Sequence, residues 1–131
     1  MSKGHILVVE DNLDNYELVR TILKLAGFDT FLAVNGRDGV NAARKQKPDL
    51  ILMDMALPEM DGWDATQRIR EDPETAHIPM IALTVHTLPR ERKRALDAGV
   101  DAYLSKPYDA AQLIKLVEST LAASKQVGTK K

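Results

Sequence analysis

The stretch LILMDMALPEMDGW, residues 50–63, joins an apolar segment directly to a segment of turn-forming residues. Its apolar residues, 50–53, end at Asp54, and a proline, two further acids and a glycine follow within eight residues. A short apolar run of this kind predicts a buried β-strand over residues 50–54. Asp54 is then either a reactive group carried to the edge of a sheet or an ordinary turn residue. The rest of the chain has to decide between these two interpretations.

The composition is that of a single domain with an ordinary core. The chain has 131 residues, of which 44% are hydrophobic and 28% charged. Its net charge of −1 gives no global signal for binding nucleic acid or an anionic membrane. The absence of cysteine excludes disulfides, thiol nucleophiles and thiolate metal sites. No apolar run suits a membrane helix or a signal peptide, so we expect a cytoplasmic protein.

Predicted strands and helices alternate along the chain. We expect strands over 5–9, 28–34, 50–54, 78–84 and 101–105, and helices over 14–26, 36–47, 62–71, 88–98 and 109–124. This alternation predicts an α/β fold, with a five-stranded parallel sheet covered by helices on both faces. The strands 5–9 and 50–54 are the most apolar, so we expect them at the centre. We predict one domain over residues 1–124 and a polar, basic, flexible tail over 125–131.

The first predicted helix carries apolar residues at helical spacing. Leu18, Ile22 and Leu25 recur on one stripe, and Val19 and Leu23 widen it. We therefore expect this stripe to face the core.

Polar residues stand where the predicted strands end. Glu10 and Asp11 follow the first strand, Asp54 ends the third, Thr84 ends the fourth and Lys106 follows the fifth. The carboxyl ends of parallel strands meet at one edge of a sheet, which is where open α/β sheets bind ligands. We therefore expect three acids, a hydroxyl and an ammonium group to converge in one cleft.

Such a cleft would have definite chemistry. Three neighbouring carboxylates repel one another, and a hard divalent cation with oxygen ligands, such as Mg²⁺, relieves the repulsion. An aspartate beside the metal can attack phosphorus and form an acyl phosphate. Lys106 and Thr84 would stabilise the phosphoryl oxygens. Taken singly, each residue has an ordinary interpretation: the acids as helix caps or turn residues, Thr84 as a structural strand residue and Lys106 as a solvated charge. Their combination, in this order, favours the reactive site.

These residues lie in a set of motifs that resembles the receiver domain of two-component response regulators. The matching segments are VVEDN (8–12), PDLILMDMALPEMDG (48–62), IPMIALT (78–84) and AGVDAYLSKP (98–107). The resemblance extends over nearly the whole chain, from about residue 5 to about residue 123. It implies a flavodoxin-like (βα)5 fold with the strand order 2-1-3-4-5.

The resemblance also implies roles for individual residues. Asp54 would be the phosphoacceptor, and the magnesium ligands would be Glu10, Asp11, Asp54 and the backbone carbonyl of Ala56. Thr84 and Lys106 would contact the phosphoryl group.

Further positions follow from the same resemblance. The Lys106–Pro107 peptide bond would be cis. Tyr103 falls on the position of the switch aromatic, which responds together with Thr84. Ala56 and His86 fall on variable positions that tune the lifetime of the phosphoryl group.

The implied function is phosphorelay signalling. The domain would accept a phosphoryl group from a histidine kinase or a histidine phosphotransfer protein, and would signal to a downstream protein through its 88–123 face. We expect no direct binding of nucleic acid or membrane, and no enzymatic activity beyond the domain's own phosphorylation and dephosphorylation. No output domain follows the last helix, so a stand-alone receiver is expected.

Three alternatives stay open at this point. The chain could be the receiver module of a hybrid histidine kinase or of a larger regulator. It could be an aspartyl-phosphate hydrolase, although such enzymes need a second acid where Ala56 stands. It could also be a scaffold that is never phosphorylated, although the intact acids, Thr84 and Lys106 argue against this.

Overall fold

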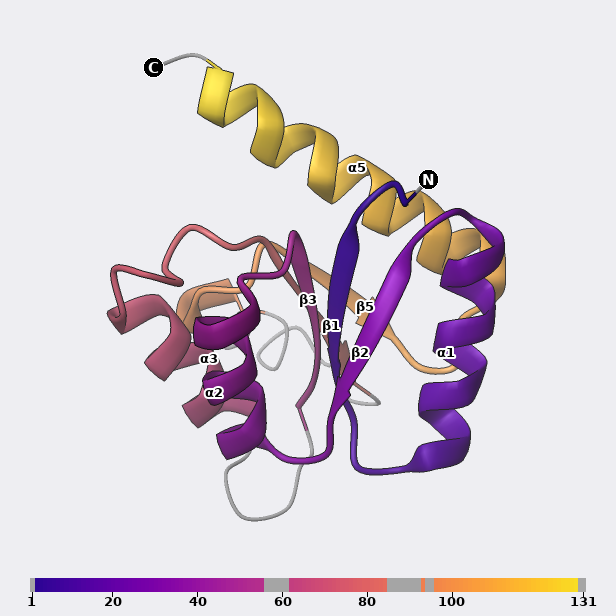
Figure 1. The fold of residues 1–131 in the computed structure, drawn as a ribbon, viewed down its shortest axis with the longest axis horizontal. Coiled ribbons are helices and arrows are strands. Elements are labelled where there is room, and N and C mark those ends of the chain that lie inside the picture. The colour runs from indigo at the N-terminus through magenta and orange to yellow at the C-terminus, as the bar shows by residue number, and fades with distance from the viewer. Residues whose placement is uncertain (1, 56–61, 85–92, 94–95, 130–131) are drawn as a thin grey trace.

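The sheet has five parallel strands in the predicted order. The computed structural model describes residues 2–55, 62–84, 93 and 96–129. The strands are β1 (His5–Val9), β2 (Asp29–Ala33), β3 (Leu50–Asp54), β4 (Met80–Thr84) and β5 (Ala102–Ser105). They pair in the order β2-β1-β3-β4-β5, with β3 in the middle (Figure 1). The predicted flavodoxin-like α/β fold is therefore confirmed.

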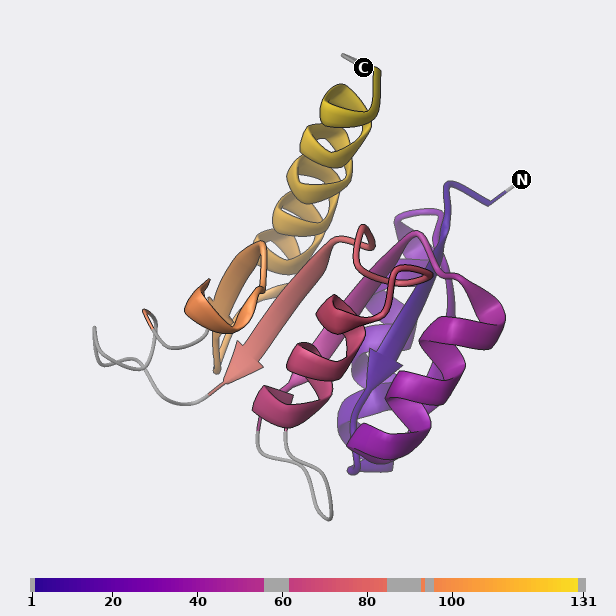
Figure 2. The same cartoon turned by 90° about the vertical axis from the view of Figure 1, so that its left-hand side faces the viewer.

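Helices cover both faces of this sheet. They are α1 (Leu13–Leu25), α2 (Gly36–Gln46), α3 (Gly62–Glu71) and α5 (Ala110–Thr129). Helices α1 and α5 lie on one face, and α2 and α3 lie on the other (Figures 1 and 2). Residues 93 and 96–98 are also helical, and the remainder of the predicted helix 88–98 lies outside the described residues. Among the described residues, no helix is long and apolar enough to cross a membrane.

The core consists of two apolar layers separated by the sheet. Strand side chains alternate between the layers because successive residues point to opposite faces. Leu7, Ile51 and Ala82 pack with residues of α2 and α3, whereas Val8, Leu52 and Leu83 pack with residues of α1 and α5. All residues of β3 and β4 are buried. The central strands thus hold rigid positions, and their carboxyl ends share one edge.

Helix α1 presents a different face to the sheet from the one expected. Val19 and Leu23 are buried, but Leu18 is 60% exposed and Leu25 is 85% exposed. The stripe read from the sequence was too wide to fit one helix face, and the Val19–Leu23 side of it packs on the sheet. The expectation that Leu18 and Leu25 face the core is therefore wrong.

Helix α5 is longer than predicted. It runs to Thr129 instead of ending at residue 124, so residues 125–129 of the predicted tail have a helical backbone. Lys125 and Gln126 favour helix and no proline interrupts the segment, so the helix continues past its core residue Leu121. In Figure 1 this last part of α5 projects beyond the sheet.

Arg70, near the end of α3, joins three segments at the amino-terminal ends of β4 and β5. Its guanidinium donates hydrogen bonds to the Asp101 carboxylate at 2.8 Å and to three backbone carbonyls, those of Gly99 (2.7 Å), Ile78 (2.6 Å) and Ala76 (3.1 Å). The same Asp101 oxygen accepts from the Met80 backbone N–H at 2.8 Å. These bonds fix the starts of β4 and β5 relative to α3.

Replacing Arg70 with alanine should destabilise the fold because three backbone carbonyls lose their guanidinium donor and the Asp101 carboxylate loses one of its two donors. We expect a loss of about 2–4 kcal/mol in the free energy of unfolding. Urea-induced unfolding measures it, with Arg68→Ala as the control on the same helix, since Arg68 is exposed. The control should change the free energy by less than about 0.5 kcal/mol. Equal effects of the two substitutions would contradict this role of Arg70.

Candidate functional site

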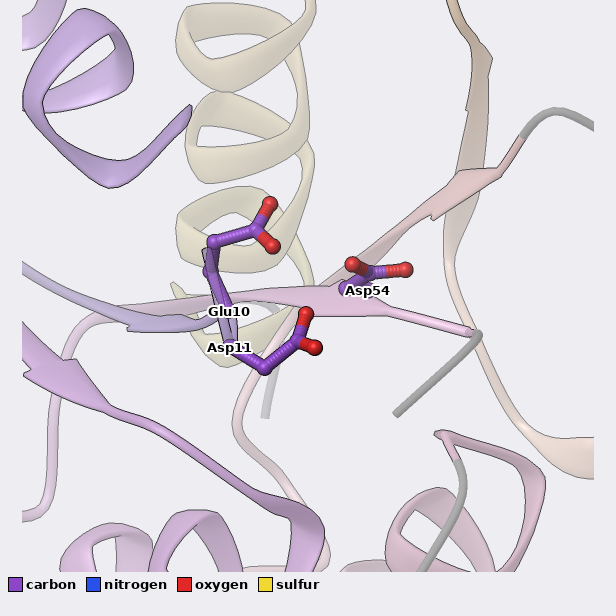
Figure 3. A group of neighbouring side chains, drawn as sticks. All are labelled: Glu10, Asp11 and Asp54. Atoms are coloured by element: carbon purple, nitrogen blue, oxygen red, sulfur yellow. The ribbon is translucent and has the colours of Figure 1, made fainter. Parts of the chain in front are cut away.

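Three carboxylates meet at the carboxyl-terminal edge of the sheet. Glu10 and Asp11 directly follow β1, and Asp54 is the last residue of β3. These strands are neighbours, with Val9 opposite Met53. One oxygen from each of the three carboxylates lies within 4.8 Å of the others (Figure 3). The structure therefore brings together the acids that the sequence placed at two separate strand ends.

Lys106 brings a positive charge to this cluster. Its Nζ atom lies 3.7 Å from Glu10 Oε1 and 3.5 Å from Asp54 Oδ2. The backbone positions it, because its N–H donates to the carbonyl of Thr84 at 2.8 Å. The Lys106–Pro107 peptide bond is cis, as the resemblance implies.

Glu10 has an unusual electrostatic environment. Its residue is only 3% exposed, and one carboxylate oxygen accepts a hydrogen bond from the Asn12 backbone N–H at 3.2 Å. Burial, and secondarily the negative charge of Asp54, raise the pKa of Glu10 to about 7, although the Asn12 bond and Lys106 act in the opposite direction. Without a metal ion beside it, this carboxyl therefore holds a proton over part of the neutral pH range.

The raised pKa of Glu10 has a consequence for stability without metal. A carboxyl that binds its proton more tightly in the folded state stabilises the fold fully below its unfolded pKa of 4.5, and this contribution is lost as pH rises through about 7. The loss is at most on the order of 3 kcal/mol.

Urea unfolding in EDTA, from about pH 5 to about pH 8, measures this loss. We expect the free energy of unfolding of Glu10→Gln to fall less over this range than that of the wild type, because glutamine does not titrate. Glu17→Gln, which alters an exposed acid on α1, should behave as the wild type. An identical pH dependence in Glu10→Gln and wild type would show that Glu10 does not titrate in this way.

Thr84 and Tyr103 lie on adjacent strands. Thr84 ends β4 and is 4% exposed. Tyr103 on β5 stands opposite Ala82, two residues before Thr84, and packs against the core layer on the α2 and α3 side. The two predicted switch residues therefore point to the same side of the sheet. Ala56 and His86 lie outside the described residues.

Two residues of the site, Asn12 and Tyr108, were not predicted from the sequence. Asn12 caps α1 through its side chain, which accepts from the Asn15 N–H at 2.9 Å, and it holds Glu10 through its own N–H. Tyr108 packs against the core layer near α1 and α5, and its pKa is raised by burial and then by the charges of Glu10 and Asp54. A polar cap residue after a strand is a recognisable signal for Asn12, but nothing local marks Tyr108.

Comparison with known proteins decides the family. The family model for the response regulator receiver domain matches residues 6–118. The chain belongs to this family. The polar-differentiation response regulator DivK of Brucella anthropi is 37% identical over 116 residues, which span 88% of this chain and 94% of that protein. The chain is thus a receiver of a signalling family and matches nearly the full length of that relative.

Solved structures agree with this assignment. The receiver domain of a sensor histidine kinase from Pseudomonas aeruginosa, with a magnesium ion coordinated in its active site cleft, is 36% identical. It superposes with a TM-score of 0.85 over 91% of this chain and 98% of that one. The chemotaxis protein CheY4 of Vibrio cholerae is 26% identical, with a TM-score of 0.84 over 89% and 98% of the two chains. The similarity therefore includes the receiver of a histidine kinase as well as a chemotaxis protein.

Proposed function

We propose that this receiver accepts a phosphoryl group on Asp54, with Mg²⁺ held by Glu10, Asp11 and Asp54, and that it signals through protein contacts. The observation that carries the proposal is the acid cluster, with oxygens of all three residues within 4.8 Å of one another. Lys106, at 3.5 Å from Asp54, supplies the cation that a phosphoryl oxygen requires.

The donor set supports magnesium. Carboxylate oxygens without histidine or cysteine suit a hard divalent cation, and Mg²⁺ usually takes only one or two carboxylates directly and keeps several waters. The proposal adds the backbone carbonyl of Ala56 as a further ligand. The magnesium described in the cleft of the Pseudomonas aeruginosa receiver supports the same site here, because the two chains are 36% identical.

The reaction is an in-line transfer between a phosphohistidine and a carboxylate. An Asp54 carboxylate oxygen attacks the phosphorus, the phosphorus–nitrogen bond breaks, and the imidazole of the donor leaves with the bonding electron pair and takes up a proton. Bound magnesium would offset the negative charge shared by the carboxylates and the phosphoryl oxygens. Lys106 binds one phosphoryl oxygen and keeps the acyl phosphate in place. The donor is a histidine kinase or a histidine phosphotransfer protein.

Asp54→Asn tests the phosphoacceptor because it keeps the shape of the side chain and removes the nucleophile. With acetyl phosphate and Mg²⁺, the wild type should gain one base-labile phosphoryl adduct by mass spectrometry, and Asp54→Asn should gain none. Asp14→Asn, at an exposed acid near the start of α1, is the matched control and should react like the wild type. The same adduct on Asp54→Asn would refute the assignment. Continuous release of phosphate from a phosphomonoester would favour an aspartyl-phosphate hydrolase instead.

The signal would pass through Thr84 and Tyr103 to the 88–123 face. When the Thr84 hydroxyl moves to bind a phosphoryl oxygen, it vacates space on the side of the sheet where Tyr103 packs. The ring then turns inward and changes the surface that a downstream protein contacts. A phosphoryl group shifts such an equilibrium only by binding one of the two states better, and the Thr84 hydroxyl provides that difference.

Thr84→Ala should therefore uncouple the switch and leave the site able to bind a phosphoryl mimic. Beryllofluoride with Mg²⁺ stands in for the phosphoryl group in ¹H–¹⁵N NMR spectra. We expect shifts around Asp54 in wild type and variant, but shifts at Tyr103 and residues 96–98 in the wild type alone. Ser105→Ala removes a hydroxyl from the position opposite Thr84 and should respond as the wild type. If the Tyr103 signal of Thr84→Ala shifted on adding beryllofluoride as much as that of the wild type, this route would be excluded.

A further inference from the structure

Helix α3 begins in direct contact with the end of the strand that carries Asp54. Its first residue, Gly62, is buried. A Cβ atom at Gly62 would lie 2.5 Å from Met55 Cα, 2.6 Å from the Asp54 carbonyl oxygen and 2.8 Å from Met55 Sδ. The first two of these are backbone atoms, which cannot rotate away as a flexible side chain can. Only glycine fits here without moving either the helix or the strand end.

We propose that Gly62 is a positioning residue for the phosphoacceptor site. Because it lacks a side chain, α3 approaches the backbone at Asp54 and Met55 closely and fixes the Asp54 carboxylate relative to Glu10 and Asp11. The inference rests on the proposed metal and phosphoacceptor site, and it adds a residue that contacts neither the metal nor the phosphoryl group.

Both sides of this contact are well packed, so a side chain at position 62 would strain it. Helix α3 is held along its length by Ala65, Thr66 and Ile69, which are all 0% exposed, and near its end by Arg70. Just beyond the strand, Met55 is buried; its N–H donates to the carbonyl of Leu83 at 3.1 Å, and its carbonyl accepts from the Gly62 N–H at 3.4 Å. A side chain at position 62 would therefore shift the backbone of Asp54 and Met55 relative to α3.

The displacement would be large for a metal site. Raising the contact with the Asp54 carbonyl oxygen from 2.6 Å to the 3.4 Å of ordinary packing requires a movement of 0.8 Å. Magnesium demands near-ideal octahedral geometry with short metal–oxygen distances. Helix propensity alone would make Gly62→Ala stabilising, because alanine is favoured over glycine within helices. A loss on Gly62→Ala would therefore be steric in origin.

The test compares Gly62→Ala with Gly99→Ala in the full chain. Gly99 has a φ of 113°, and a Cβ there would lie 2.8 Å from Arg70 Cγ, so this control also strains the fold but at the opposite edge of the sheet. The readout is the dissociation constant for Mg²⁺ alone, from NMR shifts of the Glu10 and Asp11 amides. We expect Gly62→Ala to raise it about tenfold or more, as supporting residues of metal sites do. Gly99→Ala should stay within about twofold of the wild type.

A measurement on the wild type covers the case in which Gly62→Ala fails to fold. Magnesium should shift the Gly62 amide along the same titration curve as the Asp11 amide, because the Gly62 N–H donates to the carbonyl of Met55, next to Asp54. A silent Gly62 amide, a normal dissociation constant for Gly62→Ala, or an equal rise in Gly99→Ala would each overturn the inference. A wild type that binds no magnesium would instead sink the proposed function, so the two failures are distinguishable.

Discussion

The site depends on the parallel pairing of β1 with β3. This pairing places Glu10 and Asp11 beside Asp54, although more than forty residues separate them in the sequence. Burial, and secondarily the negative charge of Asp54, raise the pKa of Glu10 to about 7, because both disfavour the ionised carboxylate. Burial of the apolar residues of these strands supplies the free energy that holds the three carboxylates together. A cation at this edge relieves a repulsion that the fold imposes.

The two edges of the sheet differ in composition: one carries structural hydrogen bonds and the other carries the site residues. At the amino-terminal ends of β4 and β5, Arg70 and Asp101 tie three segments together with hydrogen bonds of 2.6–3.1 Å. At the carboxyl-terminal edge, the strands end in acids, a hydroxyl and the segment that carries Lys106. Movement linked to the chemistry is therefore expected at the second edge, while the first stays fixed. The close approach at Gly62 belongs to the second edge but restrains its most central strand.

Local sequence pattern predicted most of the elements and the membership of the site. Apolar runs of strand length located the five strands, and their polar ends located Glu10, Asp11, Asp54, Thr84 and Lys106. The strand order came from resemblance to a known family, because periodicity does not specify which strands pair. The site roles stay predictions that the geometry supports.

Features that depend on three-dimensional contact could not be predicted in this way. Leu18 was assigned to the core because two overlapping stripes on α1 look alike in sequence, and only packing decides between them. The carbonyls that Arg70 binds belong to loops that carry no sequence signal for it. Tyr108 and Gly62 belong to the site because of their spatial neighbours, which are Glu10 and Asp54 for Tyr108 and the backbone of Asp54 and Met55 for Gly62. The end of α5 was missed because its last turns follow helix propensity beyond the core, where apolar periodicity has no information.

The position of Lys106 links the ground state to the proposed reaction. Its distances of 3.5 Å and 3.7 Å to the two carboxylates exceed the 2.7–2.9 Å of a close charge-assisted hydrogen bond. The ammonium therefore forms ion pairs with Glu10 and Asp54 that are longer than close hydrogen bonds. In the proposed reaction, a phosphoryl group on Asp54 would add negative charge there, and a short movement would bring the ammonium to its oxygens. Lys106 would then make its stronger interaction with the phosphorylated state, which is the differential binding that the proposed switch requires.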